Sequence, residues 1–205
     1  MNEYSFPFDF DLPPYLQILP GLFERLDSSR WFLNCACEYE GESLYAKRLI
    51  RASLSEFKSS FDCLNSDLRS IGKKEIWDRS AYSKQLEQDF VLRIIRNARD
   101  LSVHSNKSKA RFRSSTLRVI SPEGSHISTV SSIYFDKLEM EHDRTTLSRF
   151  TKCEIEKMQG IFEDFPCFMI LSEGYKRISI ILENFLADNK LVSLEESEAF
   201  WQPYI

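Results

Sequence analysis

A run of apolar residues spaced alternately four and three positions apart constrains the fold of this chain more than any other feature. The run consists of Ile50, Leu54, Phe57, Phe61, Leu64, Leu68 and Ile71. This spacing gathers the side chains into one stripe of an α-helix, and such a stripe packs against another helix. Gly72 follows at once and is well placed to end the helix. We therefore predict a long helix whose stripe faces the core of its own domain, with dimerisation through the stripe as the alternative.

Similar apolar spacing predicts helices on both sides of this one. The further predicted helices are a stretch over 15–40 with a break near Pro20, one continuous helix from Asp78 or Ser80 to His104, a stretch from Asp143 to Pro166, and a last helix that ends at Asn189. Four or five long helices with one β-hairpin predict a mainly α fold, an up-and-down helical bundle.

The helical pattern is interrupted by residues 107–135. A basic loop comes first, and two segments rich in Ser, Thr, Val and Ile follow at 115–121 and 125–135. Pro122, Glu123 and Gly124 separate these two segments, as expected for a turn. The pattern predicts a β-hairpin inserted into a helical protein.

The length of 205 residues is typical of a single domain, here with an extended aromatic arm at 1–14 and a tail at 190–205. The composition, 42% hydrophobic and 28% charged, predicts a globular domain with a sizeable core. The formal net charge of -4 offers no overall attraction for nucleic acid. Any binding to nucleic acid would therefore depend on a local patch.

The five cysteines are odd in number and scattered, which favours reduced, mostly buried thiols in a cytoplasmic protein. Cys35 and Cys37 lie too close together for an ordinary zinc pair, and no second pair of ligands is near. Residues 1–12 lack the basic start and the apolar run of a signal peptide. No segment is long enough to cross a membrane, so we expect no membrane partner.

The strongest candidate for chemistry is the segment 96–104, Arg-Asn-Ala-Arg-Asp-Leu-Ser-Val-His. Because each residue turns a helix by about 100°, four side chains share one face: Arg96, Asn97, Asp100 and His104. Arg99 lies about 140° from His104 on a straight helix. Asp100 and His104 stand four residues apart, so the carboxylate can fix the imidazole tautomer. An imidazole beside guanidinium groups is suited to phosphate chemistry.

The six residues from Arg99 to His104 resemble the signature of the HEPN superfamily, in which an arginine and a polar residue precede three residues and a histidine. The resemblance implies an all-helical domain, usually a dimer in which two such motifs face each other. The superfamily most often has Asn after the arginine, where this chain has Asp100. The pair Arg96 and Asn97 has the commoner residue but stands farther from the histidine. The essential arginine is therefore either Arg96 or Arg99.

Many members of the superfamily are metal-independent endoribonucleases, so the resemblance implies that activity here, without a metal or another cofactor. It gives His104 the role of general acid or base on the ribose 2′-hydroxyl. Arg99, alone or with Arg96, neutralises the charge that grows on the phosphate. Asp100 and Asn97 orient the imidazole and the RNA. A homodimer brings two motifs together and so supplies both the acid and the base.

The same resemblance implies a biological setting. Small proteins of this architecture resemble toxins and antiphage defence effectors. We therefore expect RNA as the target and a regulatory or antitoxin protein as a further partner.

A basic segment follows the motif. Residues 101–122 contain no acid, and they carry five cations: Lys107, Lys109, Arg111, Arg113 and Arg118. In an acidic protein such a run is suited to contact with an RNA phosphate backbone, or it is a solvated loop, and the sequence favours neither.

Two other hypotheses compete with the nuclease. The first is that the chain is a non-catalytic interaction module, with the apolar stripe and the aromatic termini as its contact surfaces. As a third hypothesis, a partner enzyme modifies the Arg/His motif by nucleotidyl transfer. We expect His126 to be a surface residue and His142 to cap a helix rather than bind metal.

Overall fold

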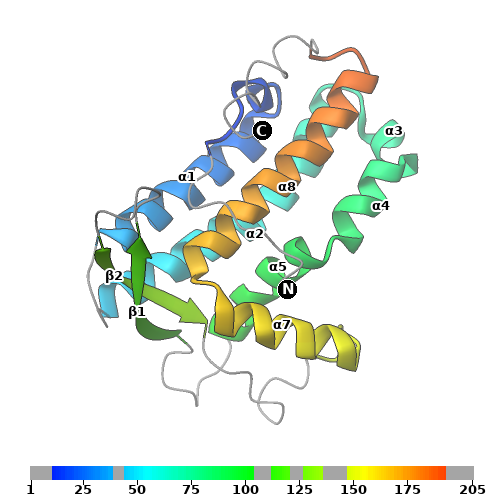
Figure 1. Cartoon of the computed structure of the whole chain (residues 1–205). Coiled ribbons are helices and arrows are strands. Elements are labelled where there is room, and N and C mark those ends of the chain that lie inside the picture. The colour runs from blue at the N-terminus through cyan, green and yellow to red at the C-terminus, as the bar shows by residue number, and fades with distance from the viewer. Residues whose placement is uncertain (1–10, 39–43, 104–111, 121–126, 136–146, 193–205) are drawn as a thin grey trace.

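The computed structural model describes residues 11–38, 44–103, 112–120, 127–135 and 147–192. The elements are a 3-10 helix η1 (Pro14–Ile18), helices α1 (Pro20–Cys37), α2 (Leu44–Ser70), α3 (Lys74–Arg79), α4 (Ala81–Gln88), α5 (Phe90–Val103), α7 (Lys152–Asp164) and α8 (Cys167–Asp188), and strands β1 (Phe112–Ile120) and β2 (Ile127–Phe135). Figure 1 shows α8 running through the middle, with α1 on one side and α4 on the other, and α7 lying across one end. The predicted mainly α bundle is therefore confirmed.

The long apolar stripe forms most of one side of α2. Six of its seven residues are buried, and Ile71 packs at the edge of the core. The stripe contacts the chain's own helices, as the ring of Phe57 shows by lying 5.6 Å from the ring of Tyr175 on α8. The prediction that the stripe faces the core of its own domain is confirmed.

The predicted stop at Gly72 is also confirmed. Gly72 has a φ of 67°, a backbone conformation that L side chains rarely adopt. The N–H of Lys73 donates to the carbonyl of Leu68 at 2.8 Å, and the N–H of Gly72 donates to the carbonyl of Arg69 at 3.0 Å. This pair of bonds is a Schellman motif, which satisfies carbonyls that the helix end leaves without partners.

The start of α1 is capped by a side chain from α2. The backbone N–H of Leu22 donates to Oδ2 of the buried Asp67 at 2.8 Å. A carboxylate is stabilising at a helix N-terminus, where N–H groups lack partners. A Cβ at Gly21 would lie only 3.0 Å from Oδ1 of Asp67, so a glycine here leaves room for the cap. The predicted break near Pro20 is present, because η1 ends at Ile18 and α1 begins at Pro20.

The prediction of one continuous helix from Asp78 or Ser80 to His104 is wrong, because α3, α4 and α5 are separate. The predicted start at Ser80 is confirmed, because Ser80 caps α4 by accepting from the N–H of Ser83 at 3.2 Å. Asp89 ends α4 and caps α5, since its Oδ1 accepts from the N–H of Leu92 at 3.0 Å. Its ψ of 122° is extended, so the helix turns at this residue.

The inserted β-hairpin is confirmed. β1 and β2 pair antiparallel, with Phe112 opposite Phe135 at the open end and Ile120 opposite Ile127 next to the turn. The open end is anchored to the bundle, because the ring of Phe135 lies 4.5 Å from the ring of Phe162 on α7. The turn itself, with His126, lies outside the described residues.

The two C-terminal helices agree with prediction except at the start of α7. Thr151 caps α7, and Glu154 completes a capping box with the N–H of Thr151. Residues 148–150 are not helical, so the helix predicted to run from Asp143 is interrupted or begins later. Asp143 and His142 lie outside the described residues. α8 ends at Asp188 with Asn189 as its C-cap, as predicted.

The cysteines are free thiols, but the expectation that most are buried is wrong. Cys167 is buried, whereas Cys37 and Cys153 are exposed at the ends of α1 and α7 and the other two are half-buried. Within the described residues, no helix has the length and apolar character that a bilayer crossing requires.

Candidate functional site

The last turns of α5 carry the residues that the sequence singles out. The structure describes the side chains of Arg96, Asn97 and Arg99. Asp100 is part of helix α5, but its side chain lies outside what the structure describes. His104, the first residue after Val103, lies outside the described residues altogether. The expected contact between Asp100 and His104 therefore stays a prediction.

Asn97 is the centre of the described part of this site. It is only 9% exposed, so its amide needs protein partners. Nδ2 donates to the carbonyl of Arg93 at 2.7 Å, and Oδ1 accepts from Nη1 of Arg149 at 2.8 Å. Both ends of the amide are thus fixed, which holds the side chain in one orientation.

Arg93 joins the same face of α5 one turn earlier. Its Nη1 donates to Glu154 at 2.5 Å, and its Nη2 donates to the carbonyl of Arg149 at 2.8 Å. The guanidinium also lies 4.8 Å from the centre of the Phe150 ring. These contacts tie the segment before α7 to α5. The N–H of Thr151 and the charge of Arg93 both lower the pKa of the Glu154 carboxyl.

Arg96 is half-buried between α5 and α2. Its guanidinium carbon lies 4.5 Å from the centre of the Phe61 ring, a cation–π contact. Burial lowers the pKa of Arg96, the charges of Glu87 and Asp62 oppose that fall, and the charge of Arg149 adds to it. Since an arginine pKa is near 12.5 to begin with, the group stays cationic. Arg96 therefore lies within the electrostatic influence of Arg149 and of the two carboxylates Glu87 and Asp62.

Arg99 lies three residues after Arg96 on α5 and is half-buried. α5 stays helical through Val103, so residues three apart remain neighbours along it. The amide of Asn97 is bonded to Arg93 and Arg149, and the guanidinium of Arg96 lies over Phe61.

The predicted RNA-binding residues are described only in part. Lys107, Lys109 and Arg111 lie outside the described residues. Arg113 and Arg118 lie on β1, opposite Tyr134 and Thr129 respectively, and the positions of their side chains are outside the description. The basic patch as a whole stays a prediction.

Sequence reasoning missed Arg93 and Arg149. Arg93 carries a usable signal, because it precedes Asn97 by four residues and so shares its face. Arg149 carries none, since its partner Asn97 is 52 residues away in the chain.

A second polar cluster lies where α4 meets α5. Arg177 on α8 donates through Nη1 to Asp89 at 2.9 Å and through Nε to the buried Glu173 at 2.6 Å. Burial raises the pKa of Glu173, and the charge of Arg177 opposes that rise. Because Asp89 also caps α5, this cluster fixes the start of the helix that bears the motif.

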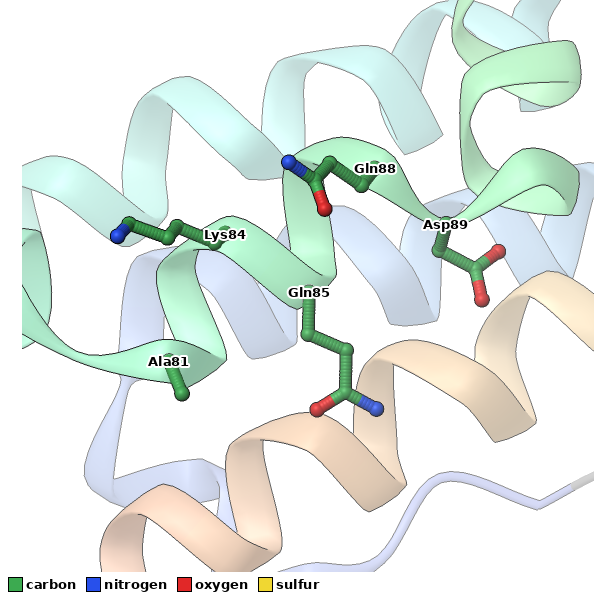
Figure 2. Close-up of a pocket in the computed structure, with 5 residues that line it drawn as sticks. All are labelled: Ala81, Lys84, Gln85, Gln88 and Asp89. Carbon is green, nitrogen blue, oxygen red and sulfur yellow. The ribbon is translucent and has the colours of Figure 1, made fainter.

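An open groove of about 470 Å³ runs along α4 and ends at Asp89. It is lined by Ala81, Lys84, Gln85, Gln88 and Asp89, and Figure 2 shows Gln85 extending toward α8 while Lys84 and Gln88 point elsewhere. Its polar lining consists of two amides, one ammonium group and one carboxylate, which is not the pairing of a nucleophile with a base. Within the described part of the chain, no three His, Cys, Asp or Glu side chains gather as a metal site.

No protein-family model, curated protein or solved structure matches this chain.

Proposed function

We propose that this protein is a metal-independent endoribonuclease of HEPN type, with its site at the C-terminal end of α5. The observation that carries this function is the linkage of Arg93 and Arg149 through Asn97, against the helix that also bears Arg96 and leads to His104. Arginines along α5, with Arg149 bonded to the helix, favour a polyanionic substrate. The basic run from Lys107 to Arg118 extends that charge in sequence.

The chemistry proposed for this site is transesterification within RNA. The neutral imidazole of His104 takes the proton of a ribose 2′-hydroxyl, and the 2′-oxygen attacks the adjacent phosphorus. The bond from phosphorus to the 5′-oxygen breaks, and a second histidine, from another copy of the chain, protonates that oxygen. The products are a 2′,3′-cyclic phosphate and a 5′-hydroxyl. Arg99, with Arg96, neutralises the charge on the pentavalent phosphate.

Such an activity is damaging unless it is controlled. We therefore propose a toxin or antiphage effector in the cytoplasm, working as a homodimer and held in check by a regulatory or antitoxin protein.

The test compares purified wild type with His104→Ala on mixed RNA in the presence of EDTA. Loss of a general acid or base costs about 10²- to 10⁴-fold in rate, so the variant should be at least about 100-fold slower. His126→Ala is the matched control, because it removes another histidine outside the motif and should leave the rate unchanged. An inactive wild type, or equal rates for wild type and His104→Ala, would contradict the nuclease.

A non-catalytic interaction module is the second candidate, and one observation favours it. Four large apolar side chains are about half exposed or more: Trp31, Leu44, Tyr45 and Ile76. Three of them lie on α1 and α2. These side chains offer a contact surface other than the apolar stripe of α2, because the stripe is buried. Exposed aromatic and aliphatic groups of this kind are enriched in protein interfaces.

A further inference from the structure

The β-hairpin is attached to the bundle through β2. This strand contacts both α7 and α8, and the ring of Phe135 lies 4.5 Å from the ring of Phe162. Ile133, Tyr134 and Phe135 are all buried, so both faces of β2 are covered at this end. Figure 1 shows this end of β2 pointing toward α7. The bundle therefore holds the base of the hairpin in a fixed position.

β1 is the outer strand of the hairpin, because β2 is the one that packs on α7 and α8. Among the described residues the sheet has two strands, so β1 pairs with β2 along one edge and with no strand along the other. Such an edge presents N–H and C=O groups to which a further strand can bond. The nine residues of β1 include no proline or glycine, which would interrupt the pairing. A two-stranded ribbon is only marginally stable in water, so further strands on this edge would stabilise it.

The charges of β1 are compatible with pairing to a second copy of itself. Two identical edges can pair antiparallel about a two-fold axis, and full overlap of the nine residues centres that axis on Thr116. Arg113 then lies opposite Val119. Arg118 lies opposite Ser114. No like charges face each other in this register, whereas an axis centred on either arginine would place two guanidinium groups opposite one another.

We propose that the outer edge of β1 is a dimer interface, on which β1 of a second copy pairs antiparallel about Thr116. The two hairpins then form one continuous four-stranded sheet in the order β2, β1, β1, β2. For the choice of a second copy over a strand of another protein, this assignment rests on the proposed function, which needs two copies of the chain, and on the register that keeps the arginines apart.

The direct test is disulfide cross-linking of Thr116→Cys. Directly opposite residues of an antiparallel pair have Cβ atoms about 4.5–5.5 Å apart, a distance that a disulfide bridges after a small shift. Ser114→Cys is the matched control, because it lies on the same face of β1 while its two copies would lie about 14 Å apart along the paired strands. Copper phenanthroline oxidises both variants and wild type, and mass spectrometry of the peptides distinguishes the new cross-link from any made by native cysteines.

Sedimentation equilibrium of Thr116→Lys is the second measurement. This change places two ammonium groups opposite each other, so we expect the dissociation constant of the dimer to rise at least about ten-fold. Ser128→Lys is its control, since Ser128 lies on β2 opposite Val119 and so one strand away from the interface. That variant should stay within about two-fold of wild type. In the first test we expect Thr116→Cys to cross-link and Ser114→Cys to stay uncross-linked.

A monomeric wild type would overturn the interface, and so would cross-linking at both engineered positions or at neither, or a dimer indifferent to Thr116→Lys. Cleavage of RNA by wild type and by His104→Ala is measured separately. Cleavage that needs His104, without a cross-link at Thr116→Cys, refutes the interface and leaves the nuclease standing. A cross-link at that position alone, without any cleavage by wild type, supports the interface and refutes the nuclease.

Discussion

Nη1 of Arg149 donates a hydrogen bond of 2.8 Å to Oδ1 of the buried Asn97, and this bond joins the segment before α7 to the last turns of α5. The carbonyl of Arg149 in turn accepts from Arg93, so the two segments are tied by bonds that run in opposite directions. The helix that bears the candidate motif is thereby held in its first turn and at its middle. Asp89 holds its N-terminal end, through the cap on Leu92.

Asn97→Ala should lower the free energy of unfolding by about 1–3 kcal/mol, because it leaves groups of Arg93 and Arg149 without their buried partner. Urea denaturation followed by circular dichroism measures the change. Asn34→Ala on the exposed side of α1 is the control and should stay within about 0.5 kcal/mol of wild type. A loss no larger in Asn97→Ala than in Asn34→Ala would mean that the amide bonds contribute little.

Two glycines in helices should respond to alanine with opposite signs. A Cβ at Gly174 on α8 would lie 2.3 Å from Cδ1 of Ile95 and 3.1 Å from the Phe57 ring, so Gly174→Ala should cost about 1–3 kcal/mol by overpacking. A Cβ at Gly160 on α7 meets nothing within 4 Å, so Gly160→Ala should stabilise by up to about 1 kcal/mol. Thermal unfolding of both variants checks the pair. A Gly174→Ala protein at least as stable as wild type would show that the approach of α8 to α5 is not tight.

Asp89 combines two roles that conservative substitution separates. Asp89→Asn keeps an oxygen for the N–H of Leu92 but loses the charge that faces Arg177, whereas Asp89→Ala loses both. We expect Asp89→Ala to be the less stable by about 1 kcal/mol, the usual contribution of an N-cap. Chemical denaturation of the two proteins measures the difference, and equal stabilities would show that the oxygen does not cap α5.

Stability should fall at high pH because of Tyr175. Its hydroxyl is buried and bonded to Ser29 at 2.9 Å, and burial raises its pKa to about 12 from the ordinary 10.0. The folded state therefore keeps a proton that the unfolded state loses, so stability is full below about pH 10 and declines as the pH rises toward 12. Tyr175→Phe should flatten that decline over the same interval in urea titrations. An unaltered pH dependence in the variant would assign the decline to other groups.

The spacing of apolar residues predicts the helices whose signals are local. Features that depend on partners far apart in the chain carry no such signal and are not predicted. The stripe of α2 and its stop at Gly72 follow from local spacing and from one left-handed residue. The break at Asp89 was missed because the apolar pattern from Leu86 to Ile94 continues across it, while Arg177, the partner that fixes it, is 88 residues away.

The start of α7 carries a local sequence signal, although the predicted start was Asp143. Thr151 and Glu154 have the spacing of a capping box, which is a local signal for a helix start. Arg149 offered no local signal, since only the fold brings it to Asn97. Of the motif itself, the sequence predicted the shared helix of Arg96, Asn97 and Arg99, while the position of His104 stays a prediction.

The termini of the cleavage products test the central claim most directly. Wild type is incubated with a DNA oligonucleotide that contains a single ribonucleotide, in EDTA, and the products are identified by mass. The proposed chemistry predicts one cut, 3′ of the ribonucleotide, with a 2′,3′-cyclic phosphate on one product and a 5′-hydroxyl on the other, and neither product with His104→Ala. An intact substrate, cuts elsewhere in the DNA, or 5′-phosphate ends would contradict it.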